Sequence, residues 1–491
     1  MDVKVIAGET GYEEVTKLFG TPENIEETSV GDFADFSERQ ITIGFRNDIA
    51  FNLRSFNQEL QGIHYQEVID RLGEPGEIKF FKDTEYDQII LIYQVNAGFQ
   101  LKWILDKPTN KEPNPTLHHI SVVALEPSTT LPEKIESMSL DEKIGQMIFA
   151  GVEGTEPNKL AEQLIQGYKV GGIIFNSENI TDSSKTLAYL NALKAKNSFN
   201  KVPLFFGIDQ EGGRISKLPG NLIDIPSNLE VGKKNDPTFS FELGAILGKL
   251  VKAYGFNIDF APVLDVNSNP KNPVIGDRSF ANNPNLVSEL GVATMKGIQS
   301  VNIIPTIKHF PGHGDTSVDS HLELPTVDKS IEELEELELI PFKKAINEGA
   351  EMVMVAHILL PKIDQDFPSS MSRVIMTDIL RKKLGYDGII ITDDMTMDAI
   401  AGNYDIGSAA VKSVVAGSDI IMVAHDYEKI VKVISALKEA VEQGEIQEER
   451  INDSVTRILQ IKEKYKMKDT QVEQVNTNAL RRELGQVLES Q

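Results

Sequence analysis

The sequence predicts an α/β protein, a (β/α)8 TIM barrel preceded by a small α+β domain built from two tandem repeats. Two patterns predict this architecture. Beyond residue 128, eight short apolar runs of β type alternate with longer helical stretches, as expected for a barrel of alternating strands and helices. Before it, one short motif occurs twice without a gap. Segments rich in proline and threonine separate the two parts.

The repeated motif reads YEEV at 12–15 with LFGTP at 18–22, and again YQEV at 65–68 with LGEP at 72–75. Each copy begins as an amphipathic helix that stops at Gly-x-Pro and then continues into β-type sequence. The pattern resembles the helix-plus-sheet repeats of some bacterial envelope proteins, such as lactamase-inhibitor-like and outer-membrane assembly lipoprotein families. A packing module without chemistry is one interpretation, and contact with the cell wall or envelope is the other.

We place the boundaries at 1–127 for the repeat module, 128–467 for the barrel and 468–491 for a polar tail, helical or disordered. A helix over 451–466 would close the ring. An open doubly wound sheet is the structural alternative, but it would concentrate polar residues at one switch point, whereas here they follow the third to seventh runs. The eight expected strands are Met147–Gly151, Gly172–Phe175, Leu204–Ile208, Asn257–Pro262, Ile303–Lys308, Met352–Ala356, Gly388–Ile391 and Asp419–Val423.

Composition excludes several classes of partner. The 491 residues carry 74 acidic and 49 basic side chains, a net charge of −25 that would repel both nucleic acid and anionic lipid. No apolar run approaches the roughly 20 residues that cross a bilayer, and the first residues lack the pattern of a signal peptide. Cysteine is absent, which excludes disulfides and cysteine nucleophiles.

The stretch KHFPGHGDTSVDSH at 308–321 begins where the fifth run ends, the end of the barrel at which active sites lie. It holds three His, two Asp and one Lys among fourteen residues. A zinc site is one alternative and a solvated polar loop another. Because the stretch lacks a helical pair of His ligands, and Lys308 would place a positive charge beside any cation, we expect neither a metal nor another cofactor.

Two further motifs place carboxylates at strand ends. Asp393 and Asp394 end an apolar strand, where a carboxyl group costs free energy unless it is used or paired. Adjacent strand residues point to opposite faces, so we expect only one of the two to face the barrel axis. Asp209 ends the third run and is followed by a Gly-Gly turn that permits close approach of a ligand.

Taken together, IDQEGGR, APVLDVNSNP, IGDRSF, KHFPGHG with DSH, and GIIITDDMTM resemble glycoside hydrolase family 3, specifically its β-N-acetylglucosaminidase branch, over about residues 135–467. The resemblance implies Asp393 as the nucleophile and His321 with Asp319 as the acid/base pair. DSH distinguishes this branch, because the β-glucosidases of the family take their acid/base carboxylate from elsewhere, commonly a later domain that we do not expect here. The resemblance implies substrate-binding roles for Asp209, Lys217, Arg278, Lys308 and His309.

Lys217 stands where the family usually has Arg, and a Lys point charge does not replace an Arg fork. His357 follows the sixth strand, and we expect it behind the groups that touch substrate.

The expected reaction is retaining, exo-acting hydrolysis of terminal β-linked N-acetylglucosamine from peptidoglycan or chitin-type fragments. Retaining hydrolysis normally uses two carboxyl groups, and here His321 would replace one, with Asp319 favouring its protonated form. Attack by the acetamido group of the substrate, phosphorolysis, β-glucosidase activity and a catalytically silent wall-binding protein are the alternatives. The repeats favour a location outside the cytoplasm, whereas the missing leader favours the cytosol, and we place the protein outside.

Overall fold

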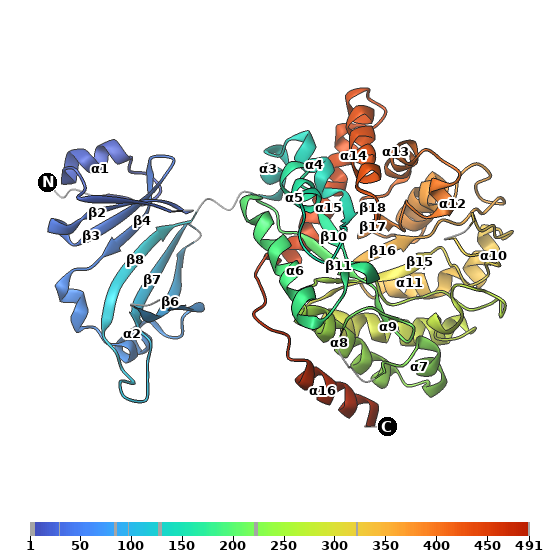
Figure 1. Ribbon diagram of the computed structural model, residues 1–491, viewed down its shortest axis with the longest axis horizontal. Coiled ribbons are helices and arrows are strands. Elements are labelled where there is room, and N and C mark those ends of the chain that lie inside the picture. The colour runs from blue at the N-terminus through green and yellow to red at the C-terminus, as the bar shows by residue number, and fades with distance from the viewer. Residues whose placement is uncertain are drawn as a thin grey trace. The chain divides into compact units, whose positions relative to one another are not determined.

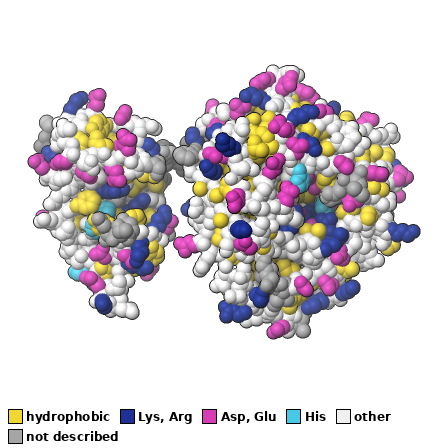
Figure 2. Space-filling model, in the orientation of Figure 1, with side chains coloured by type: hydrophobic (Ala, Val, Ile, Leu, Met, Phe, Trp, Pro, Cys, Tyr) yellow, Lys and Arg dark blue, Asp and Glu magenta, His cyan; other side chains and the backbone are white. Residues whose placement is uncertain are grey.

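The computed structural model describes residues 5–28, 30–82, 86–96, 98–125, 130–219, 224–320 and 323–489. The chain forms two compact units, residues 1–130 and 131–491 (Figure 1). Figure 2 shows acidic and basic side chains interspersed over the visible face of each unit. Within the described parts of the chain, no helix is both long enough and apolar enough to span a membrane.

The first unit is a single antiparallel sheet with two helices. A helix followed by four strands occurs twice along the chain, and the strand order is β1-β2-β3-β4-β8-β7-β6-β5. Both helices end at a glycine with positive φ, +89° at Gly20 and +76° at Gly73, a conformation that L side chains rarely adopt. The elements are α1 (Tyr12–Phe19), β1 (Asn24–Thr28), β2 (Gly31–Phe36), β3 (Ile41–Arg46), β4 (Ile49–Ser55), α2 (Tyr65–Leu72), β5 (Glu77–Lys82), β6 (Asp87–Asn96), β7 (Phe99–Asp106) and β8 (Leu117–Ala124).

Each helix of this unit buries one valine against the strands of its own half. Val15 of α1 packs with Phe36 and Phe45, and Val68 of α2 packs with Leu91 and Leu105. Burial of such side chains stabilises the unit by about 1.5–3 kcal/mol each. The first unit therefore has two small apolar clusters of its own.

The second unit contains eight parallel strands in a nearly closed barrel, in the order β17-β16-β15-β14-β11-β10-β9-β18. The Thr392 N–H donates to the Ile420 carbonyl (3.1 Å) across the remaining junction. All eight expected strands are confirmed, with shifts at their ends. The strands are β9 (Ile148–Gly151), β10 (Gly172–Ile174), β11 (Phe205–Ile208), β14 (Ile258–Asp259), β15 (Ile304–Phe310), β16 (Met352–Val355), β17 (Ile389–Thr392) and β18 (Ile421–Val423).

Helices surround this barrel (Figure 1). The helix between β16 and β17, Val374–Lys383, has π-type hydrogen bonding, and a small hairpin, β12 (Gln210–Gly212) with β13 (Ile215–Ser216), follows β11. The α-helices are α3 (Leu131–Glu136), α4 (Leu140–Gln146), α5 (Lys159–Glu162), α6 (Ser183–Lys196), α7 (Asn228–Lys234), α8 (Pro237–Ala253), α9 (Pro284–Ser300), α10 (Ile331–Glu336), α11 (Leu339–Asn347), α12 (Asp398–Ala401), α13 (Ile406–Ala416), α14 (Tyr427–Glu442), α15 (Glu448–Lys464) and α16 (Thr477–Glu489).

The carboxyl-terminal segment belongs to the barrel unit. Helix α16 lies against α8, its Leu484 is fully buried, and Lys249 of α8 pairs with Glu483. Within the segment 468–491, residues 477–489 are therefore helical and pack on the barrel unit.

Candidate active site

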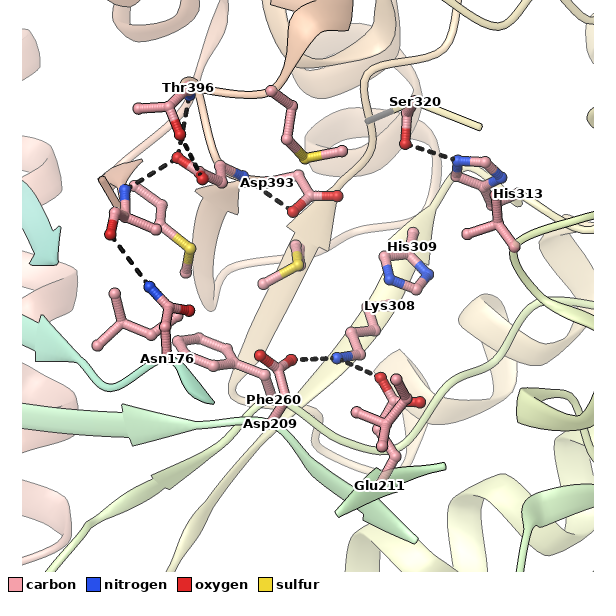
Figure 3. Close-up of a pocket in the computed structure, with 18 of the residues that line it drawn as sticks. Asn176, Asp209, Glu211, Phe260, Lys308, His309, His313, Ser320, Asp393 and Thr396 are labelled. Atoms are coloured by element: carbon pink, nitrogen blue, oxygen red, sulfur yellow. Dashed lines mark hydrogen bonds and ion pairs between the residues drawn. The ribbon is translucent and has the colours of Figure 1, made fainter. Parts of the chain in front are cut away.

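A cavity of about 480 Å³ opens where the barrel strands end at their carboxyl termini. Polar side chains border it, from the loops after several strands (Figure 3). The structure brings six of the eight predicted site residues to this cavity: Asp209, Lys217, Arg278, Lys308, His309 and Asp393.

Lys308 is the centre of a buried charged cluster at the end of β15. Its Nζ lies 2.6 Å from Asp209 Oδ1 and 2.7 Å from Glu211 Oε1, and the side chain is only 2% exposed. Lys217 directly follows β13, and its Nζ lies 2.8 Å from the other carboxylate oxygen of Asp209, Oδ2. The carboxylate of Asp209 is thus held by two ammonium groups, while its position still borders the cavity.

Glu211 connects this cluster to Arg278. The two side chains form a bidentate pair with distances of 2.8 and 2.7 Å, the strongest geometry for an ion pair between Arg and a carboxylate. Glu211 belongs to the IDQEGGR motif but was not among the predicted site residues. It is a second carboxylate two residues after Asp209, and that spacing is the signal that the prediction missed.

The ion pairs keep these buried groups charged. Burial alone would raise the pKa of Asp209, but Lys217 and Lys308 hold it well below its usual range. Burial likewise opposes the charge on Glu211, yet Arg278 and Lys308 lower its pKa to about 2. Burial would lower the pKa of Lys308, but Asp209 and Glu211 raise it. The cluster is therefore a fixed array of charges at neutral pH, suited to hydroxyl groups of a ligand.

His309 is oriented from behind by Asp265. Its Nδ1 lies 2.7 Å from Asp265 Oδ2, and its Nε2 lies 3.3 Å from the Arg278 guanidinium. Asp265 is fully buried, and its other oxygen accepts the His313 N–H at 2.6 Å. The carboxylate of Asp265 thus holds both the imidazole of His309 and the backbone of His313.

Asp393 and Asp394 both border the cavity. Strand β17 ends at Thr392, so the alternation of a strand no longer governs these two residues. They differ in their contacts. The oxygens of Asp394 accept hydrogen bonds from the Thr396 N–H (3.0 Å) and Thr396 Oγ1 (2.6 Å) of its own loop and from the N–H of Ala424 (2.9 Å), which follows β18.

The Asp393 carboxylate accepts the Asp394 N–H at 2.8 Å and, like His309 and Lys308, borders the cavity (Figure 3). The hydrogen bonds that the Asp394 carboxylate accepts are thus from its surrounding backbone and Thr396, which distinguishes it from Asp393.

The predicted acid/base pair lies in the loop after β15. His321 is outside the described residues. Asp319 is described, and its carbonyl accepts the Glu323 N–H at 3.0 Å. Ser320, between the two predicted residues, borders the cavity.

His357 lies behind the site, as expected from its position. It is fully buried, and its Nε2 lies 3.0 Å from the carbonyl of Asp394. The cavity residues that were missed include Asn176 and His425. Asn176 lies two residues after β10 and His425 two residues after β18, so extending the rule that found Asp209 by one position would have found both.

In the described part of the chain, no three His, Asp or Glu side chains are grouped to hold a metal ion. The arrangement can bind a hydroxyl-rich molecule against fixed charges and present a carboxylate to it.

Both units of the chain match known family models. Residues 139–461 match the model of the glycosyl hydrolase family 3 N terminal domain, and residues 1–123 match a domain of unknown function, DUF4309. Beta-hexosaminidase A of Pseudoalteromonas piscicida is 35% identical over 334 residues, which are 63% of this chain and 56% of that protein. The chain therefore spans just over half the length of that relative. Beta-hexosaminidase of Tolumonas auensis is 33% identical over 296 residues, 59% of this chain and 86% of the relative.

Two solved structures are also similar to this chain. The family 3 beta-N-acetylglucosaminidase from Paenibacillus sp. str. FPU-7 has 38% sequence identity and a TM-score of 0.68, covering 72% of this chain and 68% of that one. LpqI of M tuberculosis has 29% identity and a TM-score of 0.62, covering 68% and 96%.

Proposed function

The chain belongs to glycosyl hydrolase family 3, and we propose that it is a retaining, exo-acting β-N-acetylglucosaminidase. The observation that carries the proposal is the cavity at the mouth of the barrel, which is bordered both by Asp393 and by the fixed cluster of Asp209, Lys308 and Arg278. The names of the relatives, beta-hexosaminidase and beta-N-acetylglucosaminidase, support the sugar specificity.

Asp393 is proposed to attack the anomeric carbon and form a glycosyl-enzyme. The geometry supports this role because its carboxylate borders the cavity, whereas the oxygens of Asp394 are occupied by Thr396 and Ala424. The hydrogen bond from the Asp394 N–H to Asp393 Oδ1 fixes the orientation of the carboxylate. A carboxylate oxygen of Asp393 would then form the bond to the anomeric carbon of the sugar.

His321 is proposed to protonate the leaving oxygen, with Asp319 orienting it and stabilising its cationic form. Once the aglycone has left, the neutral imidazole would take a proton from the attacking water. Support comes from the position of the flanking residue Ser320 at the cavity, together with the resemblance of the DSH motif.

Asp209, Lys217, Arg278, Lys308 and His309 are proposed to bind the hydroxyl groups of the terminal sugar. Before substrate arrives Asp209 is paired with Lys217 and Lys308, and Arg278 is paired with Glu211, so little reorganisation is needed on binding. Fragments of peptidoglycan or chitin are the proposed source of that sugar.

The first unit is proposed to be a duplicated module that contacts the cell wall or envelope. Its helix followed by four strands occurs twice, with a positive-φ glycine at the same place in both halves, and this supports duplication. The proposed location outside the cytoplasm rests on the same module.

A paired assay tests the activity. Aryl β-N-acetylglucosaminide and aryl β-glucoside are offered to the full chain at equal concentrations, with and without phosphate. The proposal predicts a much larger kcat/KM for the acetamido sugar and no dependence on phosphate. Preference for the glucoside would favour a β-glucosidase, and acceleration by phosphate would favour a phosphorylase.

A further inference from the structure

We propose that His313 is a positioning residue, which holds the acid/base loop in place through a hydrogen bond from its imidazole to Ser320. The inference rests on the proposed function, because Ser320 lies between Asp319 and His321. His313 Nε2 is 3.2 Å from Ser320 Oγ, and both side chains are buried (Figure 3). His313 also borders the cavity but is not one of the proposed pair, and its effect on catalysis would be exerted through Ser320.

His313 is itself held on every side. Its N–H donates to Asp265 (2.6 Å), its carbonyl accepts the Asn272 side-chain N–H (2.8 Å), and its Nδ1 lies 2.8 Å from Thr316 Oγ1. The side chain is 1% exposed. A ring fixed in this way presents Nε2 at a defined point, which is what a positioning group requires.

The imidazole is neutral at physiological pH. Burial and the neighbouring His309 lower the pKa of His313 to about 4, although Asp265 acts in the opposite direction. A neutral ring has one donor and one acceptor nitrogen, and Thr316 and Ser320 supply hydroxyl groups that can complement either tautomer. Both hydrogen bonds therefore persist over the pH range in which a glycosidase with a His acid/base would work.

Ser320 has a second anchor from the nucleophile side of the cavity. Its carbonyl accepts the Ala399 N–H at 3.2 Å, and Ala399 lies in α12, which begins five residues after Asp393. The Asp319 carbonyl accepts the Glu323 N–H at 3.0 Å. Ser320 is thus bonded both to His313, in the loop after β15, and to α12, which follows Asp393 along the chain.

Two substitutions separate positioning from simple packing. His313→Gln places an amide near the position of Nε2 and can keep the bond to Ser320, whereas His313→Asn places its amide near Nδ1 and can keep only the bond to Thr316. Ser320→Ala removes the same bond from the other partner. His313→Asn removes more side-chain volume than His313→Gln, so packing is controlled by Ser320→Ala, which leaves His313 in place, and by the melting temperature of each variant.

The measurement is kcat and KM for two aryl N-acetylglucosaminides, one with a good and one with a poor leaving group, together with the melting temperature of each variant. The wild-type chain must hydrolyse both. We expect His313→Asn and Ser320→Ala to lower kcat by about 10- to 100-fold on the poor leaving group, less on the good one, with KM little changed. His313→Gln should recover most of the lost kcat, and adding Ser320→Ala to His313→Asn should cost little more.

Equal losses in the Asn and Gln variants, or a loss that is the same for both leaving groups, would overturn the positioning role. If a variant has a lowered melting temperature, kcat is measured below its unfolding transition. The positioning role then stands or falls on whether His313→Gln restores the leaving-group dependence of the wild type. No hydrolysis of either glycoside by the wild type would instead overturn the proposed function, and the positioning role with it.

Discussion

Charge pairing determines the properties of the individual residues in the site. The carboxylate of Glu211 forms ion pairs with both Lys308 and Arg278, so these two cations share one buried counterion. Removing one partner of such a group leaves another buried charge uncompensated, which costs several kcal/mol. Substitutions in the cluster should therefore affect binding and folding together, whereas exposed ion pairs nearby should not.

Asp209→Asn tests the cluster. The variant should lower kcat/KM by about 10- to 100-fold, because hydrogen bonds to charged groups contribute about 1.5–3 kcal/mol each. Asp277→Asn is the matched control, since Asp277 pairs with Arg214 on the surface, both about half exposed. Steady-state kinetics on an aryl N-acetylglucosaminide would check this, and equal effects of the two substitutions would contradict the role of Asp209.

His321→Ala tests the acid/base residue. It should lower kcat by about 10²–10⁴-fold on substrates with poor leaving groups and much less on activated ones, because only the former need a proton in the first step. Azide, which needs no base, should restore part of the second step and yield a glycosyl azide. A uniform loss on all leaving groups without azide product would argue against His321.

The sequence identifies residues at strand ends, and it does so for a physical reason. Polar groups that directly follow a buried strand of a barrel face one shared opening, so Asp209, Lys308 and Asp393 could be predicted one by one. Their pairing could not, because the bond from Lys308 to Glu211 joins residues 97 positions apart, and nothing local specifies it. The same holds for Asp265 and His309.

Among the elements, the strands were predictable and their ends were not. The barrel strands are buried throughout and most are short apolar runs, as parallel strands covered on both faces require, whereas β14 and β15 also carry polar residues. The fourth strand stops at Asp259, short of the expected Pro262. Hydrogen bonds to β15 continue beyond Asp259, from the Thr306 N–H to the Ala261 carbonyl and from the Lys308 N–H to the Pro262 carbonyl, so only the regular ladder ends there.

Helix α15 carries a buried cation. Lys462 donates to Gln146 Oε1 (2.8 Å) and to the Gly171 carbonyl (3.0 Å). Burial lowers its pKa to about 7, with Asp469 opposing part of the change. In the unfolded chain this pKa returns to about 10.4, so between pH 7 and pH 10 the unfolded state binds more protons and stability rises with pH.

Lys462→Met removes this titration. The melting temperature of the wild type relative to the variant should therefore increase from pH 7 to pH 10. A difference that stays constant over this range would show that the buried ammonium group keeps an ordinary pKa.

At the scale of the whole molecule, the cavity belongs to the barrel unit. The described residues that border it run from Ile174 to His425, and the described members of the two large apolar clusters of this unit all lie beyond residue 130. The first unit has its own clusters, around Val15 and Val68. Each unit therefore has the core that independent folding needs.

A chain of residues 131–491 should hydrolyse a small aryl N-acetylglucosaminide with the kcat/KM of the full chain. It should lose binding to insoluble cell-wall material in a sedimentation assay, if the first unit makes that contact. Retained sedimentation would contradict the proposed role of the first unit, and lost hydrolysis would contradict the independence of the barrel.

The proposed mechanism passes through a glycosyl-enzyme formed on Asp393 from an N-acetylglucosaminide. It is tested by mass spectrometry of the peptides of the full chain after incubation with an N-acetylglucosaminyl fluorosugar that is hydrolysed slowly. We expect the added mass of one fluoroglycosyl group on the peptide that contains Asp393, and no such addition in the Asp393→Asn variant. Turnover without an adduct, or an adduct on another carboxylate, would contradict it.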